Sequence, residues 1–332
     1  MSSARRTPSR RDVLKALPLA ALAACHRAPY RRGDFALADR SPVSLLPASN
    51  YDVDFADLIG RGLRTLGTDV RGRSVLLKPN MVEYVPGGAI NTHPAVVVGA
   101  ATAFLRAGAR EVIVGEAPGH RRDIEYLLGV TGLEDHLRDM RLRFVDLNHD
   151  DVRVTRLRSG FMGISEIALP VTVLAADIVV SMPKLKTHHW AAVTCSMKNF
   201  FGVVPGAVYG WPKNFLHFHG IDNAIVDLVA TVHPHMAIVD AVVAMEGDGP
   251  ILGQARDLGF VAMGPDLVAV DATCARAIGL DPSRIPYLSE ASRFLGNLAM
   301  SRIDQRGELL TRYQTSFKVL PAFAGLQLAS GG

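Results

Sequence analysis

Short apolar runs alternate with segments of helical periodicity along most of this chain, and this alternation constrains its fold more than any other feature. Residues 74–77 form one such apolar run, and residues 94–107 form a helical segment that Gly108 ends. Strands that alternate with helices of this length favour parallel pairing through right-handed crossovers. The sequence therefore predicts an α/β fold with a mostly parallel open sheet and helices on both faces.

The expected elements fall within one domain over residues 51–300. The expected strands are residues 74–77, 111–115, 142–145, 177–181, 236–243 and 259–263. The expected helices are residues 54–66, 94–107, 123–128, 133–140, 221–232 and 267–278. The chain after this domain, residues 301–332, is weakly patterned and is expected to be a C-terminal tail.

The N-terminal residues have the pattern of an export signal. Arg10 and Arg11 precede apolar residues and Lys15, which resembles the signal read by the twin-arginine export machinery. The apolar run over residues 16–24 is too short to span a bilayer core of about 30 Å. The alternative is a basic terminus before a buried helix, and the two patterns together favour a signal peptide over residues 1–24.

The residues that end this segment resemble the lipobox of bacterial lipoproteins, whose cysteine becomes the lipidated first residue of the mature chain. Here that residue is Cys25. We expect residues 25–50 to be a tether, and the mature protein to be held by this lipid anchor alone on the periplasmic or cell-surface side of a membrane.

The basic charge of the chain lies in this expected signal peptide. The 36 Lys and Arg residues exceed the 32 Asp and Glu residues by four, and removal of residues 1–24 would leave 31 of each. A protein without a surplus of basic residues lacks the footprint of a nucleic-acid-binding protein, so we expect no nucleic-acid partner. Cys195 and Cys274 alone cannot hold a four-cysteine iron–sulfur cluster, and whether they pair is left open.

Polar residues gather where the expected strands end. In open α/β sheets, ligands bind outside the carboxyl ends of the strands. These positions carry Lys78 and Asn80, Glu116 and His120, Lys184 and Lys186, and Asp240 and Glu246. With Lys198, the lysines could form a cationic pocket for the carboxylate or phosphate of a small anionic ligand. The alternative for each residue is an ordinary solvated loop charge.

Histidines are concentrated between positions 188 and 235. In an extended segment, residues i and i+2 share a face, so His217 and His219 could bind one divalent metal ion. His188 could also be a metal ligand. The alternative is that backbone carbonyls satisfy these imidazoles.

Several motifs resemble a bacterial and archaeal family catalogued as domain of unknown function 362. The similar segments are Lys-Pro-Asn from Lys78, Gly-His at His120, Met-Pro-Lys-Leu-Lys-Thr-His ending at His188, Lys-Asn-Phe-Phe-Gly from Lys198, Asp-Ala at Asp240, Glu-Gly-Asp-Gly-Pro from Glu246, and Gly-Pro-Asp ending at Asp266. The resemblance covers about residues 73–297. It implies an α/β fold with a cleft and no agreed reaction.

A more distant resemblance, at the level of spacing, is to the nickel-pincer lactate racemase family. His120, His188 with Lys198 ten residues later, and His217 or His219 are similar to that family's histidines and lysine. The resemblance implies a nickel-carrying organic cofactor attached to the lysine and a hydride that moves between C2 of the substrate and the cofactor. The arginine expected to hold the substrate carboxylate has no clear counterpart.

Two hypotheses follow. In the first, the protein is a metal- or cofactor-dependent enzyme for a small anionic substrate, with isomerase or redox chemistry. Its catalytic residues would be His120, Lys184 and Lys198, its metal ligands would be His188 with His217 or His219, and its cofactor-binding residues would be Lys78, Asn80, Lys186, Asp240 and Glu246. In the second, a lipoprotein binds a ligand or metal in the same cleft without chemistry.

Overall fold

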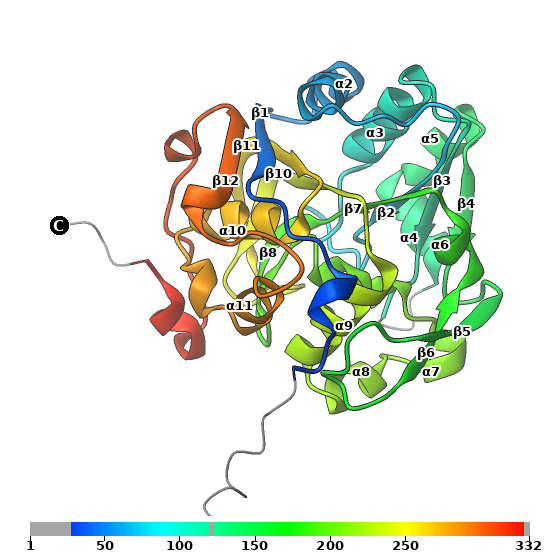
Figure 1. The fold of residues 1–332 in the computed structure, drawn as a ribbon. Helices are drawn as coiled ribbons and strands as arrows, with labels where there is room; N and C mark the ends of the chain where they lie inside the picture. Colours follow the sequence, from blue (N-terminus) through cyan, green and yellow to red (C-terminus); the bar gives the residue numbers. More distant parts are fainter. Residues whose placement is uncertain (1–27, 120–122, 329–332) are drawn as a thin grey trace, which may run out of the picture.

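A computed structural model describes residues 28–119 and 123–328, and a ten-stranded mixed sheet runs through its centre (Figure 1). The main path of the sheet has the order β12-β1-β11-β10-β7-β2-β3-β4, and β8 pairs with β10 and β9. The strands from β10 to β4 are all parallel, whereas β11 runs antiparallel to both β1 and β10. The predicted fold class, a mostly parallel α/β sheet, is confirmed.

The strands and helices have the following bounds. The strands of the large sheet are β1 (Ser41–Pro47), β2 (Ser74–Pro79), β3 (Glu111–Glu116), β4 (Arg143–Asp146), β7 (Ile178–Met182), β8 (Lys184–His188), β9 (Ala192–Thr194), β10 (Met236–Glu246), β11 (Gln254–Gly264) and β12 (Ile303–Gly307). A separate hairpin pairs β5 (Val152–Arg156) with β6 (Glu166–Pro170). The helices are α2 (Phe55–Leu66), α3 (Pro94–Arg106), α4 (Ile124–Thr131), α5 (Leu133–Asp139), α6 (Val171–Ala175), α7 (Gly206–Tyr209), α8 (Asn214–Phe218), α9 (Ile221–Val232), α10 (Leu267–Ala277) and α11 (Pro286–Ala291). The 3-10 segments are η2 (Arg32–Asp34), η3 (Lys198–Val203), η4 (Pro282–Arg284), η5 (Met300–Arg302), η6 (Leu310–Arg312) and η7 (Pro321–Leu326).

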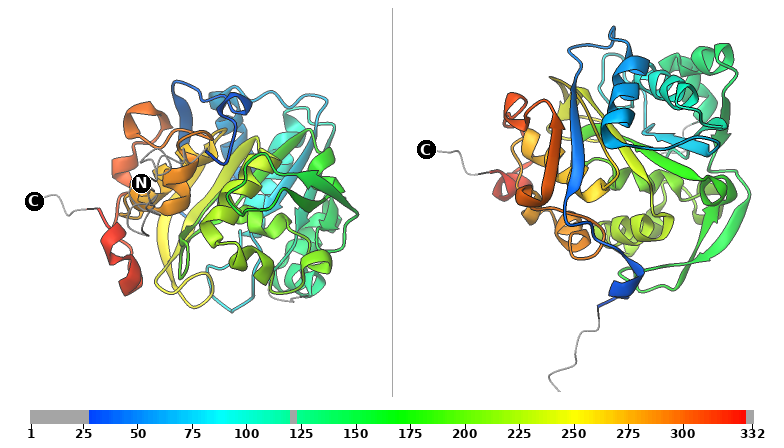
Figure 2. Two further views of the ribbon diagram at one scale, coloured as in Figure 1. Left: turned by 60° about the horizontal axis from the view of Figure 1, so that its bottom comes forward. Right: turned by 45° about the horizontal axis from the view of Figure 1, so that its top comes forward.

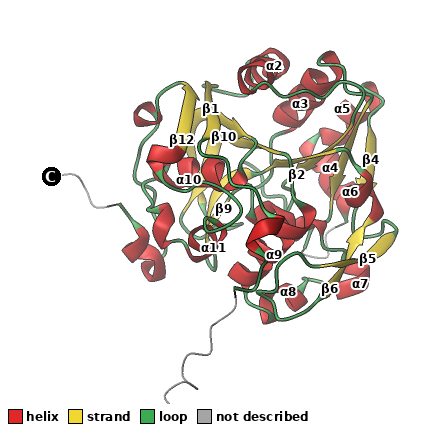
Figure 3. Ribbon diagram, viewed as in Figure 1, coloured by secondary structure: helices red, strands yellow, loops and turns green. Residues whose placement is uncertain are grey.

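Helices cover both faces of the sheet, as the views in Figures 2 and 3 show. The helices α2 to α5 pack on one face, and α9, α10 and α11 pack on the other. Along β2, Leu76 belongs to one core, whereas its neighbours Val75 and Leu77 belong to the other. This alternation follows from the two-residue period of a strand, and the apolar centre of β2 is buried on both sides.

Local signals account for the helix ends that the sequence predicts. The Asp54 side chain accepts a hydrogen bond from the backbone of Asp57 at the start of α2, and Gly67 ends that helix in the left-handed conformation. Asp266 caps α10 in the same way, through a hydrogen bond from the backbone of Ala269. These caps involve residues that are close together in the chain, so the sequence alone is enough to locate the ends of these helices.

The structure corrects the two ends of the predicted domain. Residues 41–47, expected within a tether, form β1, and residues 303–307, expected within a tail, form β12 beside it. Figure 2 shows β1 between β12 and the long strands of the sheet. Each strand contains polar residues, in the sequences Ser-Pro-Val-Ser-Leu-Leu-Pro and Ile-Asp-Gln-Arg-Gly, so neither has a clear apolar period. Before them in the chain, Tyr30 stacks on Phe294 with ring centroids 3.8 Å apart.

Candidate functional site

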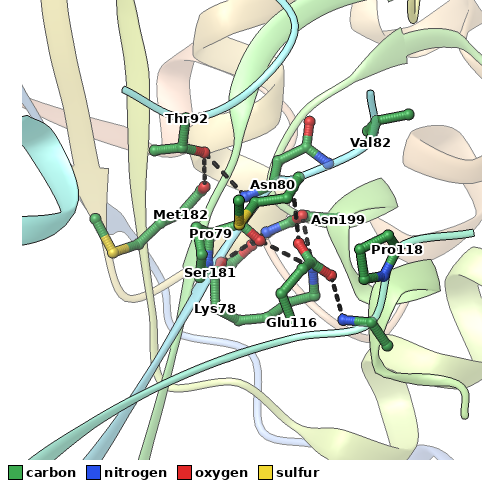
Figure 4. A network of polar contacts seen from close by, with 12 residues as sticks. Lys78, Pro79, Asn80, Val82, Thr92, Glu116, Pro118, Ser181, Met182 and Asn199 are labelled. Carbon is green, nitrogen blue, oxygen red and sulfur yellow. Dashed lines mark hydrogen bonds and ion pairs between the residues drawn. The ribbon is translucent and has the colours of Figure 1, made fainter. Parts of the chain in front are cut away.

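A buried ion pair lies where β2 and β3 end at the carboxyl edge of the sheet (Figure 4). Lys78 Nζ lies 2.7 Å from Oε1 and 2.8 Å from Oε2 of Glu116, and both side chains are buried. Nζ also donates to Asn199 Oδ1 at 3.0 Å. Burial lowers the pKa of Lys78, and the carboxylate beside it acts in the opposite direction. The ammonium group of Lys78 is therefore already paired, and its side chain lies below the site without lining it.

Backbone groups complete the coordination of this carboxylate. The N–H of Met81 donates to Oε2 of Glu116 at 2.9 Å, and the N–H of Ala117 donates to Oε1 at 2.8 Å. All of these groups donate hydrogen bonds to the carboxylate, and a carboxylate in its ionised form acts only as an acceptor. Gly202 packs so closely that a Cβ there would lie 2.3 Å from Oε1. A side chain at position 202 would displace the pair.

The amide of Asn199 joins three segments around the pair. Its Nδ2 donates to the carbonyl oxygen of Lys78 at 2.9 Å and to Oγ of Ser181 on β7 at 3.2 Å. Nearby, Thr92 Oγ1 accepts from the N–H of Asn80 at 2.9 Å. These contacts, drawn in Figure 4, form a rigid polar floor at the strand ends.

A cavity of about 670 Å³ opens onto this floor, and it brings together part of the predicted site. The predicted residues that line it are Asn80, Lys186, His188, Lys198 and His217. The other lining residues are Met81, Val82, Glu116, Ala117, Gly119, His189, Trp190, Thr194, Asn199, Phe201, Gly202, Pro212, Lys213, Asn214, Asp248, Pro250, Ile251 and Leu252. The expectation that a ligand site would form at the strand ends is consistent with this position.

Three lysines that line the cavity, Lys186, Lys198 and Lys213, have no carboxylate partner among the described residues. Their ammonium groups contact neutral groups instead, namely Ile90 O at 2.8 Å from Lys186, Ala117 O at 2.6 Å from Lys213, and the Phe201 ring centre at 3.9 Å from Lys198. Lys186 and Lys213 are buried, and Lys198 is half-buried. The cavity therefore carries an excess of potential positive charge.

Burial lowers the pKa of all three lysines. The pKa of Lys198 falls to about 7, first through desolvation and then through the charge of Lys78. The pKa of Lys213 also falls to about 7, chiefly through desolvation, and that of Lys186 falls well below its ordinary value. At neutral pH, Lys198 and Lys213 are poised between their charged and neutral forms.

His188 presents a hydrogen-bond donor to the cavity. Its Nδ1 accepts from the backbone N–H groups of Trp190 at 3.0 Å and Ala191 at 3.1 Å. Burial and the nearby charge of Lys198 lower the pKa of His188, so the ring is neutral. A neutral imidazole that accepts at Nδ1 carries its proton on Nε2.

The described residues do not fit the predicted metal site. A neutral ring with its proton on Nε2 and with Nδ1 already occupied offers no lone pair to a metal. His217 and His219 belong to α8 and its C-cap, not to an extended segment, so they do not share a face. His219 Nδ1 lies 2.8 Å from the carbonyl oxygen of Met162. Within residues 28–119 and 123–328, no three His, Cys, Asp or Glu side chains form a group that could hold a metal ion.

Lys184 and Asp240 belong to a separate buried network and do not line the cavity. Lys184 Nζ lies 2.5 Å from Oδ2 of Asp240 and donates to the Tyr51 hydroxyl at 2.6 Å. The N–H of His93 also donates to Asp240 Oδ2, at 2.9 Å. This network links β8, β10 and the start of α3, so the position of Lys184 gives no support to a catalytic role.

Glu246 likewise lies away from the cavity wall. Its Oε2 accepts from the backbone N–H of Lys318 at 3.1 Å, and its Oε1 lies 3.6 Å from Arg256 Nη1. These contacts connect β10 with the C-terminal segment. The cofactor-binding role predicted for Glu246 and Asp240 therefore has no support from their positions.

Three other predictions concern residues outside the described part of the chain. His120, the predicted acid–base residue, and Cys25, the predicted lipidation site, both lie there, as does the signal peptide over residues 1–24. In the ranges that the structure does describe, no helix is both long enough and apolar enough to cross a membrane.

Sequence reasoning placed Glu116 at a strand end without giving it a role, and it did not assign Asn199, Lys213 or Trp190 to the site. Asn199 directly follows Lys198, so its position along the chain could have identified it. Lys213 follows a proline-rich loop and adopts a positive φ of 66°. No local pattern predicts that its side chain turns towards Ala117.

Comparisons with known proteins agree with the family resemblance. A family model described as "Domain of unknown function (DUF362)" matches residues 75–276, which is more than half of the chain. The chain belongs to this family. The family's description names no activity, so membership confirms the predicted family and leaves the reaction open.

One sequence relative and two solved structures illustrate the range of similarity. The thylakoid-associated protein sll1697 of Synechocystis sp. (strain ATCC 27184 / PCC 6803 / Kazusa) is 30% identical over 268 residues, which covers 76% of this chain and 78% of that protein. The lactate racemase apoprotein from Thermoanaerobacterium thermosaccharolyticum is 12% identical with a TM-score of 0.43 and covers 72% of this chain. A protein from Thermotoga maritima is 14% identical with a TM-score of 0.38 and covers 66% of this chain. This family member spans 58% of the length of each of the two solved structures.

Proposed function

We propose that this protein binds a small organic anion in the lysine-lined cavity and catalyses a proton transfer on it. The observation that carries the proposal is the presence of Lys186, Lys198 and Lys213 in one cavity with no carboxylate partner among the described residues. Ammonium groups in a desolvated site are unfavourable without a counter-ion. A carboxylate or phosphate would supply the missing negative charge.

Lys198 is the acid–base group of this proposal. Its pKa of about 7 lets it gain or lose a proton near neutral pH, which is the property that general acid–base catalysis requires. His188 would donate from Nε2 to a substrate oxygen on which negative charge develops. The proposed reaction uses no metal ion, because the described His, Cys, Asp and Glu side chains form no group that could hold one.

Deuterium exchange tests the proton transfer. The full-length protein is incubated in D₂O with carboxylic acids that carry a C–H beside the carboxylate, and NMR follows loss of that C–H signal. We expect exchange with the wild-type protein, at least a hundredfold slower exchange with Lys198→Met, and unchanged exchange with Lys318→Met, which alters a lysine outside the cavity. Lys198→Arg keeps the positive charge but holds its proton, so it should bind the acid without exchange.

The second candidate function is binding without chemistry. The same lysines favour it, because anion binding requires only their charge. Equilibrium dialysis with the same acids separates the two functions: binding without exchange in the wild-type protein supports the second, and the absence of binding to every organic anion contradicts both.

We also propose that the protein is exported by the twin-arginine pathway and anchored through lipidated Cys25. The residues from Arg10 to Lys15 and the segment before Cys25 support this location, and the relative described as thylakoid-associated is consistent with a membrane association. Mass spectrometry of the mature N-terminus should show a lipidated Cys25. Cys25→Ser should release the protein from membranes, and an Arg10→Lys/Arg11→Lys variant should stay unexported.

A further inference from the structure

The cavity is much larger than its charged floor requires. Its volume of about 670 Å³ lies in the range of sites for drug-sized ligands. A water molecule takes roughly 30 Å³ of liquid volume, so a lone phosphate or acetate ion would leave most of the cavity filled only with water. A ligand that excludes this water must carry more than an anionic group.

The walls above the floor are apolar. Met81, Val82, Phe201, Pro250 and Ile251 all line the cavity. Two of the ammonium groups lie beside the polar floor: Lys213 Nζ donates to the carbonyl oxygen of Ala117, whose N–H donates to Glu116, and Lys198 directly precedes Asn199. The cavity therefore offers both cationic and apolar lining, with the Phe201 ring directly beside Lys198 and with Pro250 and Ile251 contributed by the loop after β10.

The rim continues the apolar lining to the surface. Trp190 is 60% exposed and Leu252 is 78% exposed, although both line the cavity. The Trp190 ring meets the His217 ring edge-on, with centroids 5.0 Å apart. Large exposed apolar side chains that border a pocket typically mark a binding surface.

We propose that the natural ligand is an amphipathic anion, with a carboxylate or phosphate head group on an apolar body. The head group lies among Lys186, Lys198 and Lys213, and the body extends along the apolar walls towards Trp190 and Leu252. This inference rests on the proposed function, because it assumes that the lysines bind an anion. It adds that apolar contacts supply much of the affinity.

Isothermal titration of the full-length protein with acetate, octanoate, octyl phosphate and octan-1-ol tests this inference. Octanoate has six methylene groups more than acetate, and their burial should tighten binding at least thirtyfold. Octan-1-ol lacks the charge, so it should bind at least tenfold more weakly than whichever of octanoate and octyl phosphate binds more tightly. The preference between octanoate and octyl phosphate identifies the head group.

Variants assign the two parts of the ligand to the two kinds of cavity lining. Trp190→Ala should reduce the octanoate-to-acetate affinity ratio about tenfold. This residue is 60% exposed, so the variant should still fold, and a thermal melt checks this. Lys213→Met should weaken octanoate and octyl phosphate but not octan-1-ol. Leu309→Ala, which alters an exposed leucine outside the cavity, is the matched control and should change nothing.

The outcomes separate this inference from the proposed function. Equal affinity for acetate and octanoate overturns the amphipathic ligand and leaves an anion site intact. Equal affinity for octan-1-ol and the octyl anions overturns the anionic head group and contradicts the proposed function as well. Failure of every anion to bind, with octan-1-ol also inert, contradicts both.

Discussion

Buried lysines dominate the chemistry of this protein at the scale of single residues. Lys78 has a carboxylate partner at 2.7 Å, whereas Lys198 and Lys213 contact only a ring and a carbonyl oxygen among the described residues. This difference matters because a neutral contact does not compensate the desolvation of an ammonium group. Of the three lysines that line the cavity, Lys198 and Lys213, each with a pKa of about 7, are therefore those whose protonation near neutral pH a bound anion would change.

Anion binding should be coupled to proton uptake. Below pH 7, Lys198 and Lys213 are already charged, so neither of them takes up a proton when an anion binds. Above pH 7, the two lysines are mostly neutral, and each must take up a proton to bind the anion as an ammonium group. The affinity for the anion should therefore fall by up to about tenfold per pH unit for each lysine. Titration of octanoate in buffers with different ionisation enthalpies measures this uptake. An affinity that is constant from pH 6 to 9 would contradict the prediction.

The Lys78–Glu116 pair should be important for stability. Glu116→Gln leaves Lys78 buried without a counter-charge, and we expect it to lower the free energy of unfolding by about 3–5 kcal/mol. Urea denaturation measures the change. In the double variant with Lys78→Met, the unpaired charge is gone, so part of the lost stability should return. If Glu116→Gln alone is neutral, the pair is not the structural support that its burial indicates.

At the scale of elements, close packing of α2 on α3 depends on one glycine. A Cβ at Gly99 would lie 2.3 Å from Cβ and 2.9 Å from the backbone carbon of Phe55. The two helix backbones could not approach this closely with a larger residue at the crossing.

Gly99→Ala should therefore lower the free energy of unfolding by roughly 1–3 kcal/mol through overpacking. Gly60→Ala, also within a helix, is a matched control, because its Cβ would meet only Arg64 Nη1 at 3.5 Å. Without a clash, alanine should stabilise α2 by roughly 0.5–1 kcal/mol. Urea denaturation of both variants measures the two effects, and equal signs for both would contradict the packing argument.

At the scale of the whole molecule, β1 connects the two ends of the chain. It pairs antiparallel with β11 and parallel with β12, so the C-terminal strand reaches the sheet only through the N-terminal one. The aromatic stack of Tyr30 on Phe294 makes a further contact between these ends. The domain therefore begins well before residue 51, which is the start that the sequence pattern predicted.

Truncation tests this role. A chain that starts at residue 28 should fold and unfold in one cooperative transition. A chain that starts at residue 48 lacks β1, leaves the edges of β11 and β12 unpaired and should aggregate or melt at a lower temperature. Scanning calorimetry and size-exclusion chromatography compare the two. Equal melting temperatures would show that β1 is dispensable.

The sequence by itself determined the fold class, most helices, the central strands and the family. Each rests on a local signal, such as the apolar run before Lys78, the helical periodicity of residues 94–107 or the motif that ends at His188. These signals act over a few neighbouring residues, so they can be read without knowing the fold. They also placed Lys186, His188 and Lys198 at the edge of the sheet where the cavity lies.

Only the tertiary structure decided which of these residues face one another and in what chemical state. Lys184 and Lys186 are both lysines of β8, two residues apart. Lys184 pairs with Asp240, whereas Lys186 pairs with no carboxylate among the described residues and contacts the carbonyl oxygen of Ile90. The proton position on His188 depends on backbone groups that a turn presents to Nδ1. Desolvation and long-range pairing depend on segments that are distant in the chain, and local periodicity carries no information about them.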